Sequence, residues 1–175
     1  TDDLTYEVAA MADIPIEGNI IPAEWLTSIK METGKTDSIS ILILSDIVYW
    51  YRPIIIRDEQ SGRILGRRKK FRADLLQRSY TDLENLFGFS RSQIKDSLQR
   101  LEKRGLILRV FRNIFTNGTT LTNVMFIKLF PEEVRNLTCK NSMGILPHTY
   151  GDKSSYPITL VPTPVETNRQ TYTET

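Results

Sequence analysis

The sequence predicts an α+β fold: a winged helix-turn-helix with an added N-terminal helix and arm, a β-hairpin wing and a flexible C-terminal tail. Two observations lead to this prediction. Residues 81–104 contain two short helical patterns separated by a three-residue turn. Residues 106–129 then change to the two-residue alternation of a β-hairpin. A hairpin directly after a helix-turn-helix is the element order of a winged helix.

Matching signals mark both ends of each helix in the helix-turn-helix. Each helix opens with the S/T-x-x-E/Q spacing of a capping box, namely Thr81 with Glu84 and Ser90 with Gln93. Gly88 and Gly105 supply the left-handed residues that end the two helices. The apolar faces consist of Leu83, Leu86 and Phe87 in the first helix and Ile94, Leu98 and Leu101 in the second.

The second helix carries polar and basic side chains opposite its apolar face, as a DNA-recognition helix does. Arg can bridge two acceptors of guanine, and Gln can pair with adenine. Residues near the helix start usually reach base edges, and cations further along suit phosphates better. The expected base contacts are Arg91, Ser92, Gln93 and Lys95, the expected phosphate contacts are Arg100, Lys103 and Arg104, and Gln99 shares the outward face. The alternative is a solvated, charged helix face, and Asp96 on this face would repel phosphate.

Charge is distributed unevenly along a chain whose formal net charge is only +2. Residues 1–56 contain 3 Lys or Arg and 9 Asp or Glu, whereas residues 57–112 contain 15 and 7. A basic middle segment that includes the helix-turn-helix is typical of a nucleic-acid-binding protein. The acidic N-terminal part is not expected to face DNA. It is expected to pack elsewhere or to contact a protein.

The densest basic run lies just before the helix-turn-helix. It consists of Arg67, Arg68, Lys69 and Lys70, followed by Arg72 and Arg78. Its position suggests phosphate contacts, and the alternative is an ordinary solvent-exposed loop.

Four further elements are expected before the helix-turn-helix. Residues 23–31 form a short helix that buries Trp25, Leu26 and Ile29. Residues 39–52 form a helix that is apolar nearly all round and therefore buried. Residues 54–57 and 63–66 form a hairpin, and residues 71–77 add one helical turn.

The hairpin after the helix-turn-helix is expected to run from 106–112 to 123–129, joined by a polar loop over 113–122. Asn117-Gly118 within this loop is a strong hairpin signal. We expect Arg112, Asn113, Asn117 and Thr119 near the tip, where they could touch the minor groove or the DNA backbone. A short helix is then expected to begin at Pro131 and continue over residues 132–137.

These elements divide the chain into three parts. Residues 1–20 are an N-terminal arm, residues 21–138 are the winged-helix DNA-binding domain, and residues 139–175 are a flexible tail rich in Pro and Thr. The chain begins at Thr1 rather than Met, which leaves two alternatives: a trimmed form or a fragment of a longer protein. The single Cys139, the lack of a secretory signal pattern and the lack of a long apolar run suggest a cytoplasmic protein that makes no membrane contact.

The residues offer little support for catalysis, so we expect no enzyme, no cofactor and no metal site. His148 is the only histidine, and one Cys with one His cannot form a usual zinc site. No phosphate-binding G-x-x-x-x-G-K-[ST] motif occurs. A metal nuclease that uses only carboxylates remains an alternative. Tyr49, Trp50 and Tyr51 could stack on bases, although core packing explains them better.

Three phrases resemble the winged-helix N-terminal domain of phage- and plasmid-type replication initiators, the replisome organisers. They are residues 46–52 (Asp-Ile-Val-Tyr-Trp-Tyr-Arg), residues 76–80 (Leu-Gln-Arg-Ser-Tyr), and residues 90–93 with 101–107. The resemblance covers roughly residues 15–138. It implies binding to repeated origin sites in double-stranded DNA. It also implies recruitment of helicase-loading partners through a C-terminal region, which we do not expect within residues 1–175.

Three functions follow from these observations. The first is a sequence-specific DNA-binding protein in replication initiation, and the second is a transcriptional repressor with the same fold. The third is a winged-helix protein-interaction module that does not bind DNA. Many helix-turn-helix proteins dimerise on two-fold sites, and residues 1–35 are the expected dimer arm.

Overall fold

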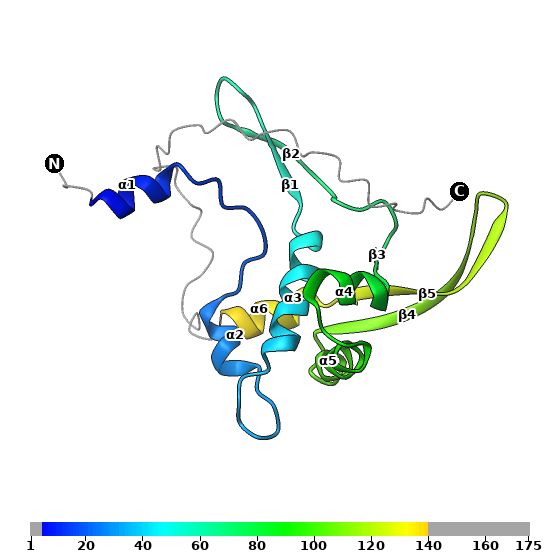
Figure 1. Cartoon of the computed structure of the whole chain (residues 1–175). Coiled ribbons are helices and arrows are strands. Elements are labelled where there is room, and N and C mark those ends of the chain that lie inside the picture. The colour runs from blue at the N-terminus through cyan, green and yellow to red at the C-terminus, as the bar shows by residue number, and fades with distance from the viewer. Residues whose placement is uncertain (1–4, 140–175) are drawn as a thin grey trace.

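A computed structural model describes residues 5–139 and has an α+β fold built around helix α3 (Ser38–Tyr51). The buried side chain of Asp37 caps α3 by accepting a hydrogen bond from the Ser40 amide. Ile43, Leu44 and Ile47 of α3 have no solvent exposure. The predicted helix over residues 39–52 is thereby confirmed. Other elements pack on several sides of α3 (Figure 1), which agrees with apolar residues around nearly its whole circumference.

Helices α4 (Tyr80–Phe87) and α5 (Arg91–Lys103) are joined by a three-residue connection. Gly88 ends α4 in the left-handed conformation, with φ of 72°. The predicted start of α4 is wrong, because Ser79 and Asp82 form the capping box rather than Thr81 and Glu84. Thr81 lies inside the helix, and its hydroxyl accepts a hydrogen bond from Arg91 instead. The capping box of α5, Ser90 with Gln93, is confirmed.

A three-stranded antiparallel sheet follows α5, with strand order β3-β5-β4. Its strands are β3 (Leu76–Gln77), β4 (Ile107–Thr116) and β5 (Thr119–Leu129). The helical turn predicted over residues 71–77 is wrong. Leu76 is buried and pairs with Ile127, so tertiary pairing outweighs the weak local preference.

Strands β1 (Ile54–Arg57) and β2 (Ile64–Arg68) form a separate antiparallel ribbon at the C-terminal end of α3 (Figure 1). The predicted hairpin is confirmed. Its second strand continues to Arg68, so it includes the first half of the basic run. We call residues 54–68 the basic ribbon.

The remaining helices are α1 (Tyr6–Ala12), α2 (Ala23–Ser28) and α6 (Pro131–Thr138). The expected arm over residues 1–20 contains α1, whose side chains are not buried. Helix α2 ends three residues earlier than predicted, and Leu26 is 47% exposed instead of buried. Trp25 and Ile29 are buried as predicted. The predicted tail, including His148, lies outside the described residues apart from Cys139.

Candidate nucleic-acid interface

Helix α5 is held in place by one fully buried face. Ile94, Leu98 and Leu101 have no solvent exposure, and α5 makes its main contacts with α3, α4 and β4. The Ser90 hydroxyl accepts from the Gln93 amide at 3.2 Å, and Gln93 Oε1 accepts from the Ser90 amide at 2.9 Å. The apolar stripe and the capping box therefore fix both the start and the rotation of the helix.

The opposite face of α5 is open to solvent. We call Ser92, Lys95, Asp96, Gln99 and Lys103 the outer ridge; all five are exposed. Their spacing of three or four residues aligns them along one side of the helix. The ridge presents two ammonium groups, a hydroxyl, an amide and one carboxylate. This set can donate to phosphates and to purine acceptors, and it can also accept from base amino groups.

Arg91 and Gln93, two of the predicted base-contacting residues, have partners within the chain. Arg91 donates to Glu84 at 2.9 Å and to Thr81 at 2.8 Å, which ties α5 to α4. Its side chain is nevertheless 52% exposed, and the Oε1 atom of Gln93 is occupied by the helix cap. Lys95 is the freer cation, because its only described partner is the ring of Tyr80, with 5.3 Å from Nζ to the centroid.

Arg100, predicted to contact phosphate, pairs with a buried carboxylate within the chain. Its guanidinium donates to both carboxylate oxygens of Asp37, at 2.6 and 3.1 Å, and to Ser97 Oγ at 2.8 Å. Burial raises the pKa of Asp37, but the hydrogen bonds from Arg100 and Ser40 outweigh this and hold the pKa below its ordinary value. Arg100 thus links α5 to the N-terminal cap of α3, with 27% of its side chain exposed.

Arg78, also predicted as a DNA contact, is likewise a structural residue. Its side chain is 8% exposed and donates to the equally buried Asp46 at 2.7 Å. The guanidinium carbon lies 5.0 Å from the centre of the Trp50 ring. The Arg78 guanidinium is thus buried against a carboxylate and an aromatic ring instead of being hydrated. A cation buried in this way cannot reach a phosphate.

The β4–β5 hairpin differs from the prediction at its tip. The expected loop over 113–122 is instead two continuing strands joined by Asn117-Gly118. Both turn residues have positive φ, 49° and 75°, as a tight two-residue hairpin turn requires. Asn117 and Thr119 therefore lie at the tip as predicted.

Arg112 and Asn113 do not lie at the tip, because the longer strands place them in the middle of the hairpin. Arg112 donates to both oxygens of Asp74, at 2.7 and 2.9 Å, and this pair lowers the pKa of Asp74 to about 2. Asn113 Oδ1 accepts from the Asn123 amide, where the strand register shifts. Both side chains thus have partners within the chain and lie away from the tip, and their contact with DNA stays a prediction.

One exposed residue near the tip was missed by the sequence analysis. Phe115 is 61% exposed and pairs with Thr120, two positions before the turn. Its neighbours Ile114 and Thr116 are buried, so the alternation of a continuing strand would have placed Phe115 outward. Treating residues 113–122 as a loop concealed this signal.

The four residues of the basic run over 67–70 have two different environments. Lys70 donates to the Tyr49 carbonyl at 2.8 Å, and Lys69 donates to the carbonyls of Arg72 and Ala73. Arg67 and Arg68 are exposed on β2. In Figure 1 the basic ribbon and α5 lie on opposite sides of α4, and the ribbon makes no extensive contact with either helix. These arginines consequently do not extend the outer ridge.

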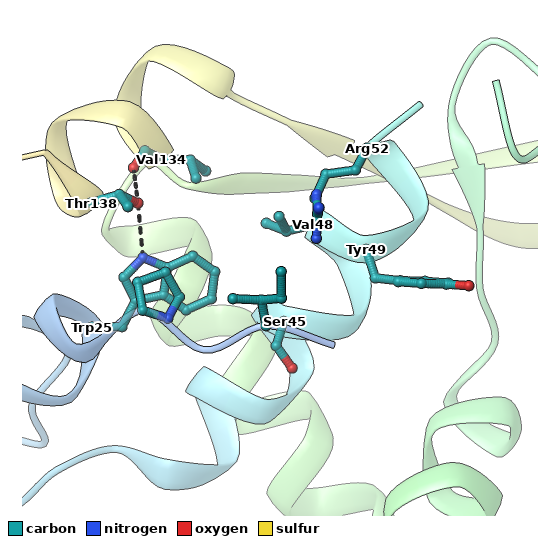
Figure 2. A pocket seen from close by; sticks show the side chains of 9 residues that line it. Trp25, Ser45, Val48, Tyr49, Arg52, Val134 and Thr138 are labelled. Atoms are coloured by element: carbon teal, nitrogen blue, oxygen red, sulfur yellow. Dashed lines mark hydrogen bonds between the residues drawn. The ribbon is translucent and has the colours of Figure 1, made fainter. Parts of the chain in front are cut away.

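An apolar cavity of about 270 Å³ lies between α2, α3 and α6 (Figure 2). Trp25 Nε1 donates to Thr138 Oγ1 at 2.9 Å across one wall, and Val48 and Val134 line the cavity. Among the described residues that line the cavity, Arg52 is the only charged one. The cavity shares no residue with α5 or with the β4–β5 hairpin.

Among residues 5–139, no three His, Cys, Asp or Glu side chains are grouped closely enough to hold a metal ion. The same residues include no helix with the length and apolar character that crossing a membrane requires. Comparisons of the chain with protein-family models, with curated proteins and with solved structures find no match.

Proposed function

We propose that this chain is a winged-helix protein that binds double-stranded DNA through the outer ridge of α5. The observation that carries the proposal is the contrast between the two faces of this helix. Its apolar face has no solvent exposure, while its polar face is free of covering residues within the described part of the chain. An exposed helix of 13 residues is about 20 Å long and fits the major groove.

The residue types on the outer ridge match the chemistry of the groove. Gln99 can pair with adenine, and Lys95 can donate to guanine or to phosphate. Asp96 would be repelled by phosphate, but its carboxylate can accept a hydrogen bond from the amino group of cytosine. Lys103, at the end of the helix, suits the DNA backbone. The β4–β5 hairpin acts as the wing, with Asn117 and Phe115 close to its tip.

We further propose a role in replication initiation, in the cytoplasm, with binding at repeated origin sites. The support is the resemblance to replisome organisers together with one packing observation. The phrases 46–52 and 76–80, which carry much of that resemblance, contact each other. Asp46 pairs with Arg78, and the Tyr51 hydroxyl accepts from the Leu76 amide at 3.3 Å. Helicase-loading partners would be recruited by a region other than the one described.

Salt dependence of binding tests the proposed backbone contact. Lys103→Ala is expected to weaken binding similarly on all duplexes and to flatten the slope of log K against log salt by about 1, because one phosphate contact is lost. The measurement is fluorescence anisotropy with a duplex selected from a random pool, titrated at several salt concentrations.

The matched control is Arg135→Ala, which removes one exposed cation from α6. The control should keep the wild-type slope. An unchanged slope for Lys103→Ala would mean that Lys103 does not contact the DNA backbone. Absence of binding at low salt would refute the proposed function.

A further inference from the structure

The described part of the N-terminal arm contacts the rest of the chain mainly near its end, where Asn19 donates to Ser45 Oγ of α3 at 3.4 Å and Ile20 lines the cavity. Helix α1 makes no extensive contact with any other described helix or strand. Aliphatic and aromatic side chains along the arm are at least half exposed, namely Tyr6, Val8, Met11, Ile14, Ile16 and Ile20. A seven-residue helix is not stable alone in water, so its apolar side chains need a surface to cover them.

The basic ribbon also exposes large apolar side chains to solvent. A two-stranded hairpin is marginal by itself, and this one exposes Ile55, Ile56, Ile64 and Leu65 at 40%, 42%, 52% and 67%. Antiparallel pairing sets Ile55 opposite Arg67 and Ile54 opposite Arg68. Each face of the ribbon therefore combines aliphatic and guanidinium groups.

The arm and the ribbon have opposite charge. Residues 5–20 of the arm contain Glu7, Asp13 and Glu17 and no Lys or Arg. The ribbon with its flanks, residues 52–72, contains eight cations and two acids: Arg52, Arg57, Arg63, Arg67, Arg68, Lys69, Lys70 and Arg72 against Asp58 and Glu59. Their lengths are also similar, at about 10 Å for α1 and about 15 Å for β2.

We infer that the acidic arm of one copy docks on the basic ribbon of a second copy, and that the exchange is reciprocal. The dimer then contains two identical arm–ribbon contacts related by a two-fold axis. The apolar side chains of both elements become covered, and the glutamates and aspartate of the arm face the arginines of the ribbon. The inference goes beyond DNA binding and uses no residue of the outer ridge.

A second copy fits this surface better than DNA does. A ribbon used only for phosphates needs cations, whereas four large aliphatic side chains on its surface require an apolar partner. The arm supplies such side chains together with the complementary charge. In Figure 1 the arm rises from α2 and turns away from the ribbon of its own chain.

Charge reversal in the full chain tests the inference. One variant, Arg67→Glu with Arg68→Glu, makes the ribbon acidic, and the other, Glu7→Arg with Asp13→Arg, makes the arm basic. Each variant alone places like charges together, so its dimer dissociation constant should rise at least about tenfold. In a mixture, each arm again meets a ribbon of opposite charge, so a heterodimer should form. Sedimentation equilibrium without DNA measures all three samples against the 20.2 kDa mass of one chain.

The control variants are Lys35→Glu with Arg135→Glu and Glu32→Lys with Glu133→Lys, which make the same charge changes at exposed positions elsewhere. Both should dimerise as the wild type does. A wild type that is monomeric at every concentration would overturn the inference, and so would two variants that remain monomeric when mixed. A ribbon variant that keeps its dimer and loses affinity for duplex would assign the ribbon to DNA instead.

Discussion

Replacing Lys95 and Gln99 together by glutamate should weaken binding to every duplex by at least about a hundredfold. The exchange places two new carboxylates in the middle of the outer ridge, where each would face phosphates or base acceptors. Like charges brought together at an interface cost several kcal/mol, and each 1.4 kcal/mol is a factor of ten in affinity. Anisotropy titrations on selected and unrelated duplexes measure the loss.

The control for this double variant is Arg135→Glu with Asn136→Asp on α6, which changes the net charge by the same amount at two exposed positions. It should retain affinity within a few-fold of the wild type. Lys95 and Gln99 are both exposed, so thermal unfolding of the test variant should match that of the wild type. Equal losses in the test and control variants would indicate a non-specific charge effect and would argue against the outer ridge.

Breaking the Arg78–Asp46 pair should produce the largest loss of stability. Asp46→Ala leaves the buried Arg78 guanidinium without its carboxylate, which is expected to lower the free energy of unfolding by about 3–5 kcal/mol. Denaturant unfolding, followed by circular dichroism, measures the change. Asp46→Leu combined with Arg78→Met should lose much less, because it removes both charges from the interior.

The comparison pair is Arg112–Asp74, in which the Asp74 side chain is 62% exposed. Asp74→Ala should lower stability by about 1 kcal/mol or less, because water screens an exposed ion pair. A similar cost for Asp46→Ala and Asp74→Ala would mean that burial does not strengthen the first pair.

The elements that the sequence predicted well are those with local causes. The capping box at Ser90, the stripe of Ile94, Leu98 and Leu101, and the Asn117-Gly118 turn all depend on residues within a few positions of one another. Such signals fixed the position and rotation of α5. They also identified the face of α5 that the structure leaves exposed.

The errors concern contacts between residues that are distant in the sequence. Arg78 and Arg100 resemble other cations of the basic segment, but their partners Asp46 and Asp37 lie 32 and 63 residues earlier. Strand β3 exists only because Leu76 and Gln77 pair with β5. No local pattern distinguishes a cation that faces solvent from one that pairs with a buried carboxylate, so the sequence did not reveal these two ion pairs.

The hairpin tip shows a different kind of error. The polar residues from Asn113 to Thr122 suggested a loop, yet Ile114 opposite Leu121 and Phe115 opposite Thr120 continue the strands. Giving more weight to the Asn117-Gly118 turn would have shortened the loop to two residues. Arg112 and Asn113 would then have been placed in mid-strand.

DNA cleavage by a tethered iron chelate tests directly whether the outer ridge faces the duplex. With Cys139→Ser as background, Gln99→Cys, Asn117→Cys and Glu133→Cys each offer one attachment point, on α5, at the hairpin tip and on α6. On a selected duplex, the chelate at residue 99 should cut the DNA within the bound site. The chelate at residue 117 should cut towards the edge of that site, and the chelate at residue 133 should give no localised cutting. A bound complex that is cut from residue 133 and not from residue 99 would contradict the proposed orientation.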